Sequence, residues 1–418
     1  MISVLEKMTN PGFDVEKIRG DFDYLKLDGE PIVYLDNAAT TQRPNAVIDR
    51  VAEFYRSENA NPLRGNHRLS LAATEAYESA RARIAEFIRA PRPEQVIFTR
   101  NASESLNLVA YSLGLSRLRA GDEVLITRME HHSNSVNWQF VCQKTGAKLV
   151  YLDLEADYQI SIEQVKAKLN ERTKIFAFTG ASNVLSTVPD AREFIRLGHE
   201  AGAVCVMDGA QLVPHERVDV QDLDCDFLAF SGHKMLAPFG VGVLYGKQAL
   251  LEEMPPFLYG GEMIEYVYDD YATYAPLPYK FEAGTQNVGG AVGLHAAIDY
   301  IEAIGIDKIE AYEKALGEYC AQQLRALGFI DVYHPEHGAR GAAVAFNVRE
   351  VHPHDVSTIL DARGIAIRSG HHCTQQLHAA LELHASCRAS FAFYNTKEEV
   401  DQLIDGLREV RKIMGFEA

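Results

Sequence analysis

Short apolar runs alternate with longer amphipathic segments over most of the first two thirds of the chain. The runs with the length and composition of buried strands are residues 95–99, 123–127, 148–152, 174–179, 203–208 and 226–230. Helix-length segments such as 103–114 and 190–202 lie between most of them, and the second follows Pro189 and ends on glycine. This alternation predicts a mainly parallel sheet with helices on both faces, in which ligands bind beyond the carboxyl ends of the strands.

The pattern changes after residue 253. Residues 254–285 are rich in Pro, Gly and Tyr, which predicts a long loop or a hairpin. Two helical stretches follow at 289–305 and 306–328, then short strands at 342–348 and 364–368, and a closing helix at 397–415. Because this is enough chain for a second core, we predict a large domain over residues 21–294 and a small α+β domain built from residues 1–20 and 295–418.

Charge and composition narrow the possible partners. The 418 residues include 58 acidic and 41 basic side chains, so the formal charge is −17, which is unsuited to nucleic acid or an anionic membrane. No apolar run is long enough to span a bilayer, and "MISVLEKMTN" resembles neither a secretory signal nor a transit peptide. We therefore expect a cytoplasmic protein whose partners are small molecules or proteins.

The six cysteines form no C-x-x-C pair, which argues against a disulfide framework or a zinc ribbon. Cys205 lies inside an apolar run and Cys320 continues a helical apolar stripe, so both are expected in the core. Cys373 differs, because it follows Arg, Gly and two His in "RSGHHCT". From the residues alone it could be a buried filler, a metal ligand or a nucleophile.

Two charged residues follow the ends of predicted strands. Lys234 comes just after 226–230 in "SGHK", at the expected mouth of the sheet, although taken alone it is more often explained as a solvated surface lysine. Asp208 ends the run 203–208, with Gln211 three residues later. A carboxylate at that point needs a partner, and a cationic ring nitrogen would be one.

Two further strand ends offer binding groups. His131 in "MEHHSN" has a flat ring that could stack on a planar cofactor, or it is an ordinary loop histidine. The backbone N–H groups of Ala102 and Ser103 begin a helix, which suits a phosphate or a plain helix cap. Lysine, aspartate, a stacking histidine and a phosphate site together are what pyridoxal 5'-phosphate requires, because the lysine forms a Schiff base and the aspartate keeps the ring nitrogen protonated.

With these residues in view, the chain resembles the group II, SufS-like cysteine desulfurases, within class V of the fold-type-I pyridoxal-phosphate enzymes. The resemblance covers nearly the whole chain and is carried by "YLDNAATTQRPNAVID", "RGNHRLS", "MEHHSNSVNWQ", "ASNVLSTV", "DGAQ", "SGHK", "FEAGTQNVGG", "IRSGHHCTQQL" and "CRASFAFYNTKEEVDQLIDGL". It implies a large, mainly parallel, seven-stranded α/β/α domain and a smaller α+β C-terminal domain.

The resemblance also implies a role for each site residue. Lys234 would hold the cofactor, His131 would stack on it and take part in proton transfer, and Asp208 and Gln211 would contact the ring. The phosphate would be held by Ala102, Ser103, Ser231 and His233, with Thr285 reaching the phosphate of the other subunit of a homodimer. The substrate would contact Asn183, Arg388, Arg368 and His67. No metal site is expected.

In such enzymes the cysteine of this loop attacks the sulfur of L-cysteine, which leaves L-alanine and an enzyme persulfide. The residues around Cys373 favour this role, because Arg368, His371 and His372 could lower the pKa of the thiol and Gly370 lets the loop move. The persulfide sulfur would pass to a SufE-like or SufU-like acceptor for iron–sulfur cluster assembly. The alternatives are a selenocysteine lyase, a cysteine-sulfinate desulfinase or, from another class, a non-catalytic scaffold.

The chain departs from the usual wording of the family at several positions. Gln376 stands where a proline is common, which leaves the stiffness of the cysteine loop in question. Asn101 and Ser186 replace glycines that are usual in relatives, and asparagine tolerates the left-handed turn that glycine would take. None of these changes removes a group that the chemistry requires.

Overall fold

The computed structural model describes residues 13–27, 29–338 and 341–416. Its largest sheet has seven strands in the order β4-β10-β9-β8-β7-β5-β6, and only β10 runs antiparallel to its neighbours. The strands are β4 (Val96–Thr99), β5 (Glu123–Thr127), β6 (Lys148–Leu152), β7 (Thr173–Thr179), β8 (Val204–Asp208), β9 (Phe227–Ser231) and β10 (Gly242–Gly246). The predicted mainly parallel, seven-stranded sheet is confirmed. β10 was not among the predicted strands. It follows β9 after only the short 3-10 helix η6 (Gly232–Lys234) and a loop, and pairs with β9 antiparallel, so it falls outside the alternation of strands and longer helices.

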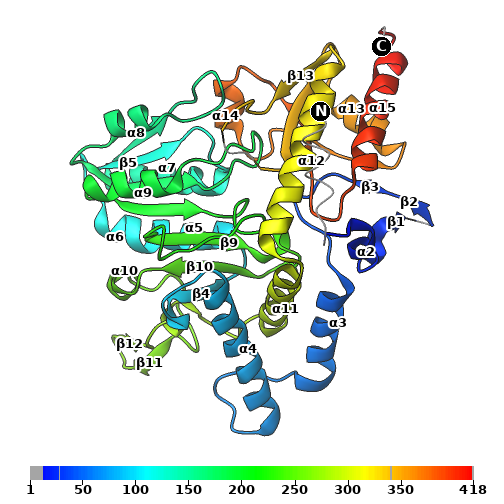
Figure 1. The fold of residues 1–418 in the computed structure, drawn as a ribbon. Coiled ribbons are helices and arrows are strands. Elements are labelled where there is room, and N and C mark those ends of the chain that lie inside the picture. The colour runs from blue at the N-terminus through cyan, green and yellow to red at the C-terminus, as the bar shows by residue number, and fades with distance from the viewer. Residues whose placement is uncertain (1–12, 28, 339–340, 417–418) are drawn as a thin grey trace.

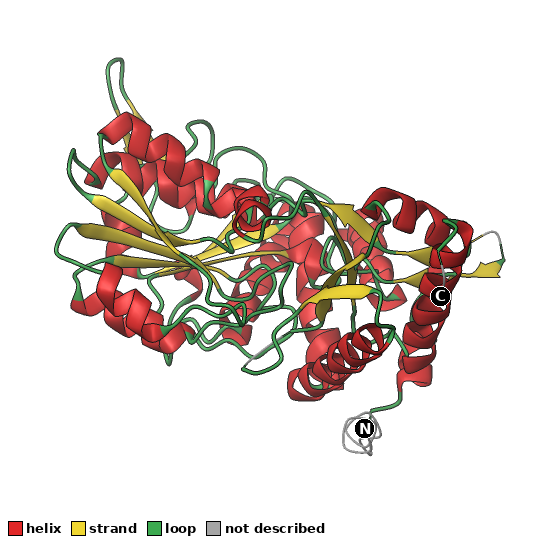
Figure 2. Ribbon diagram, turned by 90° about the horizontal axis from the view of Figure 1, so that it is seen from above, coloured by secondary structure: helices red, strands yellow, loops and turns green. Residues whose placement is uncertain are grey.

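Helices cover both faces of this sheet (Figure 2). Alternate residues of β7 enter two separate cores, as the period of a strand requires: Phe176 and Phe178 lie in one and Ile175 and Ala177 in the other. The first core includes residues of α4 (Arg68–Phe87), α8 (Ile162–Lys168), α9 (Ala191–Glu200) and α11 (Val288–Ile304). The second includes residues of α5 (Ala102–Leu108), its π-helical continuation η4 (Val109–Gly114), α7 (Val136–Thr145) and α10 (Gln248–Glu253).

A second, antiparallel sheet has the strand order β13-β14-β17-β16. Its strands are β13 (Ile330–Tyr333), β14 (Ala343–Val348), β16 (Arg368–Gly370) and β17 (Ser386–Ser390). The helices of this part are α12 (Ile306–Ala326), α13 (Pro353–Asp361), α14 (Gln375–Ala380) and α15 (Lys397–Ile413). In Figure 1 most of this part lies on one side of the molecule, whereas α14 reaches back to the large sheet.

The N-terminal part of the chain joins the second sheet's side of the molecule. Strand β3 (Val33–Tyr34) pairs in parallel with β15 (Ile365–Ala366), and α2 (Val15–Arg19) lies nearby, with Arg19 paired to Glu399 of α15. Strands β1 (Lys26–Leu27) and β2 (Glu30–Pro31) pair with each other in this part, and helices α3 (Asn45–Glu53) and η2 (Phe54–Glu58) lead on to α4. Helix α6 (Leu115–Arg117) directly follows η4 on the side of the large sheet. The predicted domain boundary at residue 294 lies inside α11, and residues 1–12 of the predicted small domain lie outside the described residues.

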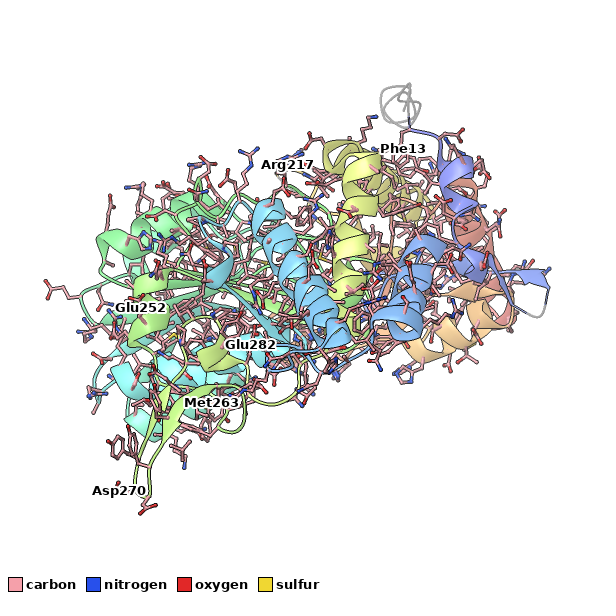
Figure 3. The ribbon with its side chains drawn as sticks, turned by 90° about the horizontal axis from the view of Figure 1, so that it is seen from below. Phe13, Arg217, Glu252, Met263, Asp270 and Glu282 are labelled. Carbon is pink, nitrogen blue, oxygen red and sulfur yellow. The ribbon has the colours of Figure 1, made fainter. Side chains whose placement is uncertain are left out.

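The Tyr-rich segment 254–285 contains a hairpin, which is one of the two alternatives that its composition predicts. Strands β11 (Ile264–Val267) and β12 (Ala272–Tyr274) form it, and Figure 3 shows Asp270 at its tip, extended away from the rest of the molecule. The end of the segment is fixed by Glu282, which is buried and paired with Arg81 (Nη1–Oε1 2.7 Å) while it accepts hydrogen bonds from Tyr77 and the backbone of Phe98. Throughout the described ranges, no helix combines the length and apolarity that crossing a bilayer demands.

Candidate active site

A cavity of about 210 Å³ lies at the carboxyl ends of the parallel strands, between the large sheet and the segment from β16 to β17. The chain folds this way because the polar residues that follow each apolar strand must emerge at one edge of a parallel sheet. The structure brings most of the predicted site residues to its wall, namely Ala102, Ser103, His131, Asn183, Asp208, Gln211, Ser231, His233, Lys234, Arg368, Cys373 and Arg388.

Lys234 and Asp208 are the charged pair of the cavity floor. Lys234 follows β9 in a short turn, and burial lowers the pKa of its amine to about 8, although Asp208 acts in the opposite direction. Asp208 ends β8, and burial raises the pKa of its carboxyl, which is partly offset by a hydrogen bond from the N–H of Ala210 (3.0 Å). A substantial fraction of Lys234 is therefore a neutral amine near pH 8, and Asp208 is a desolvated acid suited to a cationic partner.

His131 is held as a neutral ring. Its Nδ1 accepts a hydrogen bond from the backbone N–H of Ser133 (3.1 Å), so the ring proton lies on Nε2. Burial, together with the nearby charge of Lys234, lowers the pKa of His131 to about 3. The ring can therefore stack on a planar group and donate from Nε2 at neutral pH without carrying a charge.

Hydroxyl and backbone donors gather where α5 begins. Asn101 caps the helix by accepting from the N–H of Glu104 (3.0 Å), and the N–H of Ala102 donates to Ser231 Oγ (2.8 Å). Ser103 Oγ is hydrogen-bonded to Ser133 Oγ, so side chains from three strand ends meet at this point. The donor set and the positive end of the helix suit a phosphate group.

Arg388 lies on β17 with only 2% of its surface exposed. Its Nη1 donates to the carbonyl of Asn183 (2.9 Å) and its Nη2 to Asp36 Oδ1 (3.0 Å), whereas its buried Nε finds no partner among the described residues. The other oxygen of Asp36 lies 3.4 Å from Nη1 of Arg368. A guanidinium that lines the cavity and is held in place by two partners is suited to a substrate carboxylate.

Asp36 was not predicted as a site residue. It lies in "YLDNAATT", two residues after β3, so its place after a strand was the signal that could have identified it. Ser133, which orients His131, was missed in the same way, although it stands in the quoted motif "MEHHSNSVNWQ".

Cys373 is exposed, whereas the other cysteines are buried, including Cys205 and Cys320, which were predicted in the core. Its wall position beside Lys234 excludes the role of a buried filler, and a Cys373 thiolate lies near enough to raise the pKa of both Lys234 and Arg388. Among the described residues the His, Cys and acidic side chains with a spacing suited to a metal are His199, Cys205 and Asp226, so Cys373 has no such partners.

His372 differs from its expected electrostatic role. The ring is buried, and Nε2 lies 3.1 Å from the carbonyl oxygen of Ser386, to which it donates. Burial, with help from Arg388, lowers the pKa of His372 to about 2. A neutral ring adds no positive charge, so His372 does not supply the charge that was expected of it.

This neutral histidine predicts a dependence of stability on pH. The unfolded chain binds a proton at His372 below about pH 6.5, whereas the folded chain does not. The unfolded state is therefore favoured increasingly as the pH falls below that value, and the free energy of unfolding decreases. Lowering the pH from 7 to 5 should reduce the free energy of unfolding, measured by urea denaturation, by about 2 kcal/mol more in the wild type than in His372→Gln. The exposed His337→Gln should behave as the wild type, and equal losses in wild type and His372→Gln would contradict the assignment.

Comparison with known proteins places the chain in a family. The model of the family described as "Aminotransferase class-V" matches residues 33–403. The chain belongs to that family. It is 50% identical over 392 residues to a "Probable cysteine desulfurase" of Halalkalibacterium halodurans, covering 93% of this chain and 96% of the relative. It is 46% identical over 415 residues to a "Cysteine desulfurase" of Haloferax volcanii, covering 96% of this chain and 97% of the relative.

A solved structure agrees with these relatives. The crystal structure of the Escherichia coli cysteine desulfurase CsdA in an S-sulfonic acid form superimposes with a TM-score of 0.90 at 38% identity, covering 96% of this chain and 99% of that one. The family and fold expected from the sequence motifs are therefore confirmed.

Two predicted residues lie away from the cavity. His67 caps α4, where its Nδ1 accepts from the N–H of Ser70 (3.3 Å). Thr285 lines a different pocket, together with Arg100 and Asn287. One chain therefore does not bring either residue to Lys234, and the role expected for Thr285 was at the site of the other subunit.

Proposed function

We propose that the protein is a pyridoxal-phosphate-dependent cysteine desulfurase, which converts L-cysteine to L-alanine and retains the sulfur as a persulfide on Cys373. The observation that supports this most directly is that an exposed cysteine and a half-buried lysine line the same cavity. The chain is also 45–50% identical, over nearly its full length, to relatives named cysteine desulfurases.

The donor set of the cavity fits the cofactor. Lys234 would hold it covalently, Asp208 would pair with its ring nitrogen, and His131 would stack on the ring. The N–H and hydroxyl groups near the start of α5, from Ala102, Ser103, Ser231 and His233, would hold the phosphate, and Gln211 would contact the ring. When bound, pyridoxal phosphate withdraws electrons from the substrate α-carbon and so permits the bond changes at the neighbouring carbon.

The residues of the chain move the protons. Lys234, with a pKa lowered to about 8, can accept the α-proton as a neutral amine and return a proton later. His131 keeps a proton on Nε2 and offers it as a donor at neutral pH. The buried Arg388, which lines the cavity and is held in place by Asn183 and Asp36, would bind the substrate carboxylate, with Arg368 beside it.

The sulfur step uses Cys373. Its thiolate Sγ would attack the substrate sulfur, forming an S–S bond as the substrate C–S bond breaks. The electron pair of that bond stays on carbon, which takes up a proton to become the methyl group of alanine. The persulfide left on Cys373 carries the sulfur to an acceptor.

The proposal also covers the oligomeric state, the cellular location and the sulfur acceptor. We propose a cytoplasmic homodimer, in which Thr285 would act at the site of the partner subunit. The exposed loop of Cys373 would present the persulfide to a SufE-like or SufU-like protein for iron–sulfur cluster assembly.

Incubation of the purified holoenzyme with L-cysteine tests the function. We expect alanine to appear and the peptide that contains Cys373 to gain the mass of one sulfur atom, both by mass spectrometry. L-selenocysteine and L-cysteine sulfinate serve as comparison substrates. The proposal is wrong if the enzyme turns over these two substrates but forms neither alanine nor a persulfide from L-cysteine.

A further inference from the structure

The loop that carries Cys373 has an unusual backbone. His372 and Cys373 have φ angles of 50° and 58°, so two successive residues with side chains adopt the left-handed conformation. That conformation is unfavourable for such residues and persists only where the surroundings hold it. The short helix α14 begins directly afterwards, at Gln375.

The large sheet holds the inner side of this loop. Asn183 Nδ2 donates to the carbonyl of His372 (2.8 Å), and the backbone N–H of His132 donates to the carbonyl of Cys373 (2.8 Å). The ring of His132 also accepts from the N–H of Gln375 (3.0 Å), so one histidine contacts the chain at Cys373 and again two residues later.

The outer side is held by a contact between distant parts of the chain. Gln376 Nε2 donates to the hydroxyl of Tyr151 on β6 (2.9 Å). Tyr151 is itself fixed, because the guanidinium of Arg128 lies 4.0 Å from its ring centroid and pairs with Asp153 (3.0 Å). The α14 helix therefore cannot move away from the large sheet without breaking this bond (Figure 1).

We propose that Gln376 and Tyr151 are positioning residues that hold the Cys373 loop in its left-handed conformation, with the thiol facing Lys234. Where relatives commonly have a proline, this chain would stiffen the loop with a hydrogen bond to the large sheet. The effect on sulfur transfer rests on the proposed function, whereas the effect on the loop does not.

Hydrogen–deuterium exchange of the holoenzyme without substrate tests the effect on the loop. Tyr151→Phe removes only a hydroxyl and keeps the ring under Arg128, and Gln376→Leu removes only the amide. Each should speed exchange of the peptide that spans residues 371–376 about 5-fold, because each loses one net hydrogen bond. The double variant should exchange no faster than the faster single variant, because both changes break the same contact.

The matched control is Tyr319→Phe, which removes a comparable hydroxyl bond to Asp401 (2.6 Å) far from the loop. It should leave exchange of residues 371–376 at the wild-type rate. Exchange that is unchanged in Tyr151→Phe and Gln376→Leu, or additive in the double variant, would overturn the proposal.

Rapid mixing with L-cysteine tests the consequence for chemistry. The rate of persulfide formation on Cys373 should fall about 5-fold in both variants, with the visible absorbance of the bound cofactor unchanged. Wild-type rates in variants whose loop exchanges faster would overturn the positioning role. If the wild type itself forms no persulfide, the proposed function is wrong. The exchange data still decide whether the contact between Gln376 and Tyr151 holds the loop.

Discussion

Replacing Cys373 with serine is expected to lower alanine formation from L-cysteine by at least about 10³-fold, because a hydroxyl is a poor nucleophile toward sulfur. The substitution exchanges one sulfur for an oxygen in the cavity wall and removes none of the groups that would bind the cofactor. Cofactor absorbance should therefore equal that of the wild type, and no persulfide should form. Steady-state alanine production and mass spectrometry of the loop peptide measure the two effects.

Cys142→Ala is the matched control, because Cys142 is buried in α7 and lies outside the cavity. It should retain the wild-type rate. Full alanine production by Cys373→Ser would refute the persulfide route and would favour an enzyme that eliminates sulfur or selenium without an enzyme thiol.

Lys234→Ala should be the most damaging single change to the cofactor site. Without the amine, the cofactor loses its covalent attachment and the α-proton loses its base, so turnover should fall by at least about 10³-fold. Borohydride treatment of the wild-type holoenzyme should fix the cofactor on the peptide that contains Lys234, as read by mass spectrometry, and should label nothing in the variant.

Lys397→Ala controls for the loss of a lysine, since its partner is Asp401 in the surface helix α15. It should keep both the label and the activity. Borohydride labelling of a different lysine in the wild type would show that the assignment of Lys234 is wrong.

The electrostatics of the Cys373 loop show why a sequence motif alone misleads. Two histidines, an arginine and a cysteine in succession suggest a positively charged thiol environment. In the fold, however, one of those rings is buried beside Arg388 and donates to Ser386, which keeps it neutral. The charge of a histidine depends on its burial and partners, which come from other segments of the chain.

The sequence by itself determined the strands of the large sheet except β10, the hairpin segment, the family, and a set of residues that the structure brings to one cavity. These follow from local information, because apolar runs form buried strands and the residues after them emerge at one edge of a parallel sheet. Tertiary structure alone decided the pairing of Asp36 with Arg388, 352 positions away, and of Tyr151 with Gln376, 225 positions away. It also decided that His372 is neutral and that Thr285 lies away from Lys234. Such contacts depend on how two sheets pack together, and a pattern of neighbouring residues carries no record of that packing.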